Sequence, residues 1–140
     1  MEFKNCINYL LTGAQHEVFQ LISEKLLPYD VTPGQYGVLN CLWRQEATTP
    51  KDMARVLGLE TTTVSGVLDR MQKKGLIERD VDPNDRRCVH VRLTERGMAL
   101  ERPVLSVVDE VNHQVWSLFP KEDADKLASC LRVIIQKKLT

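Results

Sequence analysis

Two short helix-forming segments joined by a glycine-containing turn constrain the fold more than any other part of the chain. The first, residues 49–57, begins with a threonine N-cap and a proline at the first helical position. Asp52, three residues after the cap, completes a capping-box arrangement, and Gly58 ends the helix. The second helix is predicted over residues 61–74, and Gly75 closes it. This spacing predicts a helix-turn-helix.

An alternating apolar and polar pattern follows the second helix. Residues 76–81 and 88–93 alternate as strands do, and a polar loop separates them. They predict an antiparallel hairpin with Asp85, Arg86 and Arg87 near its tip. A helix-turn-helix that continues into a hairpin is a winged helix-turn-helix, and the hairpin is its wing.

Helices are also predicted before this motif. Apolar residues at helical spacing form one stripe through residues 2–27, and Pro28 ends that helix. Thr32 caps the next helix, whose first residue is Pro33. The second of these helices supplies aliphatic and aromatic residues to the core of the domain.

Two further helices are predicted after the hairpin. Thr94 caps a long helix that Pro103 should kink, and a final amphipathic helix covers residues 121–139. A small winged core cannot bury the apolar stripes of the first and the last two helices completely. We therefore expect a second copy of the chain to cover them, as a homodimer. The alternative is that these helices close over the core of their own monomer.

The length of the chain fits a single domain. With 140 residues and 43% hydrophobic composition, one workable core is expected and a second is not. The predicted fold class is mainly α with a small β-hairpin wing, over residues 1–140. Within it, residues 32–93 form the winged helix-turn-helix lobe, and residues 1–31 and 94–140 form a helical dimerisation region.

Composition argues against several classes of protein. Lys plus Arg and Asp plus Glu both count 19, so any affinity for nucleic acid must come from local placement of charge. The chain shows no membrane span and no signal-peptide pattern, so we expect a cytoplasmic protein without a membrane partner. The four cysteines are expected to be reduced, with no C-x-x-C pair and no nearby histidine that would suggest a zinc site. No cofactor or metal is therefore predicted. No catalytic motif is present either, so we do not expect an enzyme.

The second helix of the helix-turn-helix has one apolar and one polar side. The apolar side carries Val64, Val67, Leu68 and Met71. The polar side offers short hydroxyl groups followed by cations, which suit base edges and phosphates in a major groove. A glycine in mid-helix costs about 1 kcal/mol relative to alanine, and close approach to DNA would explain it. The alternative is an ordinary solvated face. The candidate DNA-contacting residues of this helix are Thr61, Thr62, Thr63, Ser65, Gly66, Asp69, Arg70 and Lys73.

The tip of the hairpin carries a second group of candidate DNA contacts. Asp85 can accept a charge-assisted hydrogen bond from Arg87 or Arg86 and so fix one guanidinium while the other extends. An extended arginine suits a narrow minor groove, where the negative potential is enhanced. The alternative is an exposed ion pair worth under about 1 kcal/mol.

The sequence resembles the MarR family of bacterial winged helix-turn-helix transcription regulators. The resemblance rests on Asp85-x-Arg87 followed by Val91-x-Leu93-Thr94 and Gly97, on Leu68-Asp69-Arg70-Met71, on Lys74-Gly75-Leu76-Ile77-Glu78-Arg79, and on Thr32-Pro33-x-Gln35-Tyr36-x-Val38-Leu39. It implies a homodimer that binds pseudo-palindromic double-stranded DNA, with recognition helices in successive major grooves and wings in the flanking minor grooves. It also implies repression that a signal relieves.

The resemblance implies two kinds of signal. Many members bind small anionic aromatic molecules in a crevice between the dimerisation helices and the DNA-binding lobe. The lining candidates here are His16, Gln20, Tyr36 and Trp43, for each of which a core or interface role is the alternative. Other members sense oxidants through a cysteine near the start of the first helix, where this chain has Cys6. The family pattern places a tyrosine four residues after that cysteine, and this chain has Leu10 there.

The predicted function is that of a sequence-specific DNA-binding transcription regulator. We expect a repressor released by a phenolic or other anionic aromatic ligand. One alternative is a redox-responsive regulator that senses through Cys6. Another is a winged-helix interaction module that does not bind DNA, which the zero net charge would suit.

Overall fold

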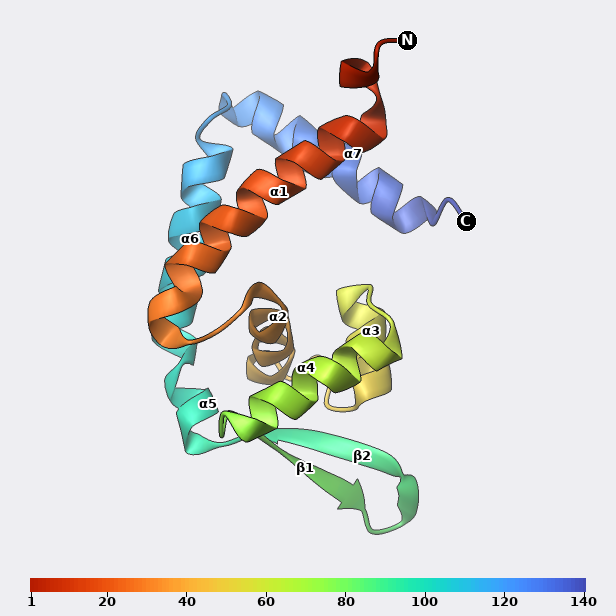
Figure 1. Cartoon of the computed structure of the whole chain (residues 1–140), viewed down its shortest axis with the longest axis vertical. Coiled ribbons are helices and arrows are strands. Elements are labelled where there is room, and N and C mark those ends of the chain that lie inside the picture. The colour runs from red at the N-terminus through yellow and green to blue at the C-terminus, as the bar shows by residue number, and fades with distance from the viewer.

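The computed structural model describes residues 1–140 and is helical apart from one hairpin (Figure 1). The mainly α fold class with a β-hairpin wing is confirmed. Short 3-10 turns precede and follow the first helix, at Phe3–Asn5 and Leu27–Tyr29. The helices are α1 (Ile7–Leu26), α2 (Pro33–Trp43), α3 (Pro50–Leu57), α4 (Thr61–Lys73), α5 (Glu95–Ala99), α6 (Glu101–Trp116) and α7 (Lys121–Lys137), and the strands are β1 (Ile77–Asp82) and β2 (Asp85–Leu93).

Short-range signals define several of the helix ends. The Thr32 side chain accepts a hydrogen bond from the Gln35 backbone N–H, and the Gln35 side chain accepts one from the Thr32 N–H, which is a full capping box. Thr49 caps α3 through the Asp52 N–H, but no bond returns from the Asp52 side chain, so the capping box predicted there is only half formed. Gly58 and Gly75 have the positive φ angles, 66° and 75°, that end α3 and α4.

The core lies in the lobe that α2, α3, α4 and the hairpin form with the start of α6. Eighteen buried residues make one cluster there, and Leu39, Met53 and Leu68 are 0% exposed. Full burial of such a side chain stabilises the fold by about 1.5–3 kcal/mol. The recognition-helix candidate α4 is therefore held by packing along its whole length, because Val64 and Met71, near its two ends, are also fully buried.

The strands β1 and β2 pair from Ile77 opposite Leu93 to Val81 opposite Val89. We expected the second strand to start at residue 88, and the structure corrects this to Asp85. The loop shortens because the Asn84 N–H donates to the Asp82 carboxylate, and a bulge at Val81/Asp82 brings Asp82 opposite Asp85. The hairpin is also tied to the lobe, since the Val91 N–H donates to the Thr48 carbonyl at 2.7 Å.

The long helix predicted after the hairpin is two helices. The break falls at Leu100, between α5 and α6, and not at Pro103. Pro103 lies in the first turn of α6, where a missing N–H leaves no helical hydrogen bond unmade. The prediction of a kink at Pro103 was wrong, because a proline in the first turn of a helix does not interrupt the helix, whereas a proline in its interior does.

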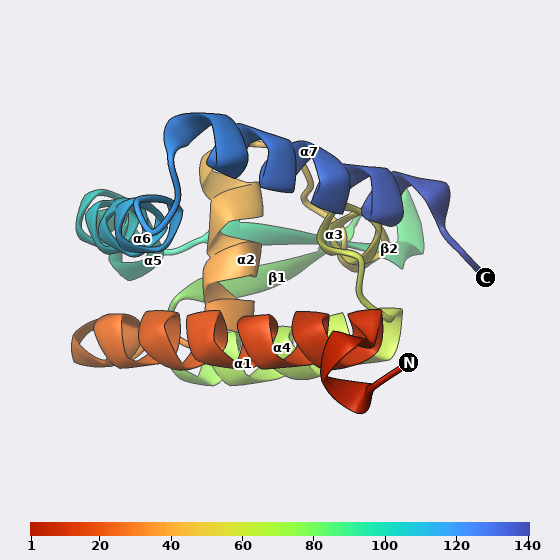
Figure 2. The same cartoon turned by 90° about the horizontal axis from the view of Figure 1, so that it is seen from above.

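The helices α1 and α7 are poorly covered in the single chain. Both termini lie on the same side of the molecule in the two views, and both are above the hairpin in Figure 1 (Figures 1 and 2). Of the large hydrophobic residues that are exposed, nine lie in residues 1–27 and seven in residues 118–139. Leu26 is the one buried residue of α1, and α7 has none, whereas α6 buries Val104, Val108 and Val111. None of the helices combines the length and the apolar character that a bilayer crossing requires.

Candidate nucleic-acid interface

The helix α4 presents the polar side that the sequence predicts. The four apolar residues of the opposite side are at most 8% exposed, and Gly66 is half-buried. The exposed polar residues are Thr61, Thr62, Thr63, Ser65, Asp69, Arg70, Gln72 and Lys73. The helix lies above the hairpin in Figure 1. One extended partner can therefore contact both the polar side of α4 and the wing.

Gly66 has no packing reason to be a glycine. A Cβ atom added there meets no atom nearer than the Arg70 guanidinium at 3.8 Å, which is ordinary contact with a flexible side chain. The position also has a helical backbone conformation that any residue adopts. The absence of a side chain is therefore unexplained inside the monomer, and close approach of an external surface stays the explanation.

Asp69 is part of an ion pair that the sequence analysis did not identify. The Arg79 guanidinium contacts the Asp69 carboxylate at 2.7 Å, and its Nε donates to the Gln72 side chain at 2.7 Å. Arg79 comes from β1 and reaches α4 only because the chain turns back at Gly75. No short-range pattern in the sequence could have found this pair. It brings one more guanidinium to the polar side of α4.

The two arginines at the wing tip differ. The Asp85 carboxylate accepts from the Arg87 backbone N–H at 3.0 Å and lies 3.4 Å from the Arg87 Nε. The Arg87 side chain is nevertheless 94% exposed, so this contact is a weak, solvated ion pair. The Arg86 side chain has no hydrogen bond or ion pair within the chain. Both guanidinium groups are thus free to meet phosphate oxygens.

A group of hydrogen bonds joins the end of α4 to α5. The Thr94 hydroxyl donates to the Gly75 carbonyl at 2.6 Å, and the Arg96 guanidinium donates to the Lys74 carbonyl at 2.8 Å. From the other side, the Trp43 indole N–H donates to the Gly97 carbonyl at 3.0 Å. These bonds fix the direction of α4 relative to the helices that lead to the C-terminus.

The four candidate ligand-binding residues do not form one cluster. Tyr36 and Trp43 come together on α2, with ring centroids 6.5 Å apart. Burial raises the pKa of the Tyr36 hydroxyl, and Asp109 on α6 raises it further. His16 and Gln20 are exposed on α1. Neither lines the apolar groove of about 860 Å³ that α1 forms with α6 and α7.

The redox candidate Cys6 lies apart from the two other cysteines that are at least half-buried. Cys6 is half-buried at the N-cap of α1, where the Phe3 and Tyr9 rings are 5.0 Å apart. Cys88 is half-buried on β2, with its Sγ 3.7 Å from the His90 Nε2. Cys41 is buried in the core, where burial raises the pKa of its thiol.

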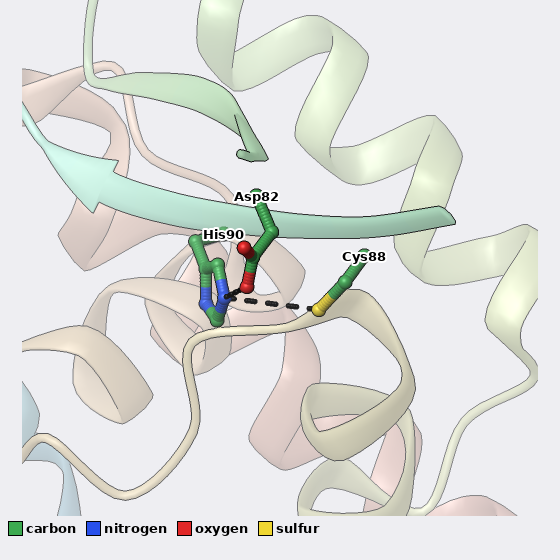
Figure 3. A group of neighbouring side chains, drawn as sticks. All are labelled: Asp82, Cys88 and His90. Carbon is green, nitrogen blue, oxygen red and sulfur yellow. Dashed lines mark hydrogen bonds and ion pairs between the residues drawn. The ribbon is translucent and has the colours of Figure 1, made fainter. Parts of the chain in front are cut away.

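A group of potential metal ligands lies on the wing, although the sequence analysis predicted no metal site. The ligand atoms of Asp82, Cys88 and His90 all lie within 4.8 Å of one another (Figure 3). Hydrogen bonds from the Asn84 N–H and then from His90 hold the pKa of the Asp82 carboxyl below its ordinary value. The Cys88-x-His90 spacing is visible in the sequence, whereas the Asp82 carboxylate comes from the neighbouring strand and is placed by the turn.

Comparisons with known proteins agree with this geometry. A family model described as "MarR family" matches residues 31–89. The chain is 33% identical over 120 residues to the multiple antibiotic resistance protein MarR of Escherichia coli, covering 86% of this chain and 81% of that protein. It is 32% identical over 136 residues to the organic hydroperoxide resistance transcriptional regulator of Bacillus subtilis, covering 97% of this chain and 91% of the relative. The match to the E. coli transcriptional repressor MprA, 34% identical over 88 residues, spans only 50% of that protein.

Among solved structures, the fold is similar to that of MepR from S. aureus in complex with DNA. The TM-score is 0.87 at 30% sequence identity, and the match covers 97% of this chain and 99% of that chain. The likeness extends over the lobe and the flanking helices alike.

Proposed function

The chain belongs to the MarR family, and on this premise we propose that it is a dimeric, DNA-binding transcription regulator that acts as a repressor. The observation that carries the proposal is the exposed polar side of α4, with its hydroxyl groups, cations and bare Gly66, placed next to a wing with two free guanidinium groups. The DNA complex of MepR, which shares the fold and 30% of the residues, supports it.

The candidate residues have four different roles. The hydroxyl groups of α4 read base edges in the major groove, whereas Arg70 and Lys73 neutralise phosphates. Arg86 and Arg87 enter a minor groove beside the site. Asp69 acts as a positioning residue, because its carboxylate holds the Arg79 guanidinium at 2.7 Å against the polar side of α4.

A second copy of the chain covers the exposed apolar residues of α1 and α7. We assign residues 1–31 and 94–140 to dimerisation and residues 32–93 to DNA binding. The support is the concentration of exposed large hydrophobic residues in the terminal segments and the apolar groove between α1, α6 and α7. Sedimentation equilibrium should give twice the 16.0 kDa of the chain, and a monomer at micromolar concentration would contradict this assignment.

DNA binding is tested by titrating the protein against a random duplex pool, followed by selection of the preferred site. The wild type should bind with an affinity that falls steeply with salt, because phosphate contacts release counterions. A protein-interaction module would show no such dependence.

The same titration with the Gly66→Ala variant tests whether Gly66 faces DNA. The helix should gain about 1 kcal/mol of stability, because alanine is the better helix former. Binding to the selected site should nevertheless weaken by at least about tenfold, equivalent to roughly 1.4 kcal/mol, because the added methyl group separates the helix from the groove. Unchanged affinity would show that Gly66 does not face DNA.

The signal that releases the repressor is a small aromatic anion in our proposal. The half-buried pair Tyr36 and Trp43 supports it, because Trp43 also holds Gly97 through the indole N–H and so connects α2 to α5. A bound ring that moves Trp43 would shift that contact. The B. subtilis relative, a regulator of organic hydroperoxide resistance by name, instead favours a second candidate, oxidation of Cys6.

A thermal-shift screen of phenolic acids and oxidants separates the two signals. If the protein senses a ligand, a single compound is expected both to raise the Tm of the free protein and to weaken the binding of the protein to DNA. Trp43→Phe should reduce this response. A response confined to oxidants and lost in Cys6→Ser would replace the ligand by a redox signal.

A further inference from the structure

The wing carries three metal-ligating side chains on one face. Cys88 and His90 are two residues apart on β2, so their side chains point to the same side of the strand. Asp82 belongs to the end of β1, and the bulge at Val81/Asp82 leaves its carboxylate directed toward His90 (Figure 3). The three groups are exposed or half-buried, so an ion can reach them from solvent.

The distances between the ligand atoms match a tetrahedral metal. Zn–N and Zn–O bonds of about 2.0–2.2 Å and a Zn–S bond of about 2.3 Å place neighbouring ligands ~3.3 Å apart for N and O and ~3.6 Å for N and S. The observed separations are 3.3 Å from the His90 Nε2 to the Asp82 Oδ2 and 3.7 Å from the Nε2 to the Cys88 Sγ. The remaining pair, Asp82 and Cys88, lies within 4.8 Å and needs a shift of only about 1 Å by exposed side chains.

A second group of contacts orients the histidine ring. The Nδ1 of His90 lies 3.3 Å from the Thr48 hydroxyl. With Nδ1 protonated and donating to this oxygen, the Nε2 lone pair is free for a metal, as is usual for histidine ligands. Thr48 is itself fixed, because its carbonyl accepts from the Val91 N–H. The ring is therefore held with Nε2 directed at the other two ligands.

We propose that Asp82, Cys88 and His90 form a zinc-binding site on the wing, with three protein ligands and a fourth position for water or an external oxygen. One thiolate, one imidazole and one carboxylate suit Zn²⁺ and other borderline divalent ions. They do not suit Mg²⁺ or Ca²⁺, which prefer oxygen ligands alone.

Binding changes the charge of the wing. The Zn–S bond forms as the Cys88 thiol loses its proton to solvent. The ion brings two positive charges and the released proton removes one, so the wing gains one positive charge. This charge lies on the same hairpin as Arg86 and Arg87. If the proposed function holds, Zn²⁺ should tighten DNA binding about fivefold, as expected for one charge about 4 Å from a phosphate in water. This consequence rests on the proposed function, whereas the site itself does not.

The site is tested without DNA by titrating the reduced full-length protein with Co²⁺ and then with Zn²⁺. One equivalent of Co²⁺ per chain should give the sulfur-to-cobalt charge-transfer band of a thiolate ligand, and Zn²⁺ should abolish it. Cys88→Ser should remove the band, and His90→Gln and Asp82→Asn should each weaken Co²⁺ binding at least tenfold. Thr48→Val should also weaken it about tenfold, as loss of an orienting contact does.

Cys130→Ser is the matched control, because Cys130 is an exposed thiol on α7, away from the wing. It should bind Co²⁺ as the wild type does. Circular dichroism and the Tm of each variant without metal show whether the fold is kept. Absence of the band in the wild type, or a band that survives in Cys88→Ser, would overturn the proposal and leave the three side chains as a hydrogen-bonded group. Because the readout uses metal alone, failure of the site and failure of DNA binding are distinguished.

Discussion

A variant in which Arg86 and Arg87 are both alanine is expected to bind its selected DNA site at least about 60-fold more weakly than the wild type at 0.1 M salt. This lower bound follows from counterion release, which contributes a slope of about 0.9 for each phosphate contact. Even one contact from each of the two wings of the dimer accounts for about 1.8 decades at this salt concentration. Neither side chain packs on the core: Arg86 has no partner, and Arg87 is 94% exposed. The variant should therefore keep the stability of the wild type.

The measurement is fluorescence anisotropy over a series of salt concentrations. The slope of log K against log salt should become shallower by about 0.9 for each contact that is lost. Lys126→Ala combined with Lys137→Ala removes the same charge from α7, at the other end of the molecule from the wing, and should leave the slope unchanged (Figure 1). Sedimentation checks that both variants remain dimers. An affinity and a slope equal to those of the wild type would remove the wing from the mechanism.

Gly97→Ala is expected to destabilise the protein by about 2–3 kcal/mol or more, at the upper end of the cost of overpacking. A Cβ atom at this position would lie 2.3 Å from the Leu76 carbonyl oxygen and 3.0 Å from the Leu93 side chain. The carbonyl cannot withdraw, because it accepts from the Thr94 N–H at the junction of β2 and α5. Relief would have to move α5 and break the bond from Trp43 to the Gly97 carbonyl.

Urea denaturation measures this effect, with Gly13→Ala as the matched control. Gly13 lies within α1, and a Cβ atom there meets nothing within 4 Å. The control should therefore be more stable than the wild type by about 1 kcal/mol, since alanine favours the helix. If Gly97→Ala lowered the free energy of unfolding by less than about 0.5 kcal/mol, the expected clash would be absent, and α5 would be free to shift relative to Leu76.

Helix ends were the part of the fold that the sequence predicted best. Thr32, Thr49 and Thr94 are N-caps as expected, and Gly58 and Gly75 have positive φ angles. Each of these signals depends on hydrogen bonds or sterics within about four residues, so the information is complete in the local sequence. The apolar side of α4 was predictable for the same reason, because its period is set by the helix alone.

Predictions that depended on neighbouring elements were less accurate. The long helix after the hairpin breaks at Leu100, and β2 begins at Asp85, three residues earlier than expected. The Asp69–Arg79 ion pair, which no local pattern indicated, depends on how β1 packs against α4. The periodicity of a single segment does not indicate how that segment packs against its neighbours.

The sequence by itself therefore determined the order of the elements, the two sides of α4 and the two arginines at the wing tip. Only the tertiary structure decided which residues from different elements come into contact. It brought Trp43 to Gly97, Arg79 to Asp69, and Asp82 to Cys88 and His90. The physical reason is that caps and periodicity are short-range properties of one chain segment, whereas a contact between distant residues exists only after packing has fixed the turn, the bulge and the register that place them.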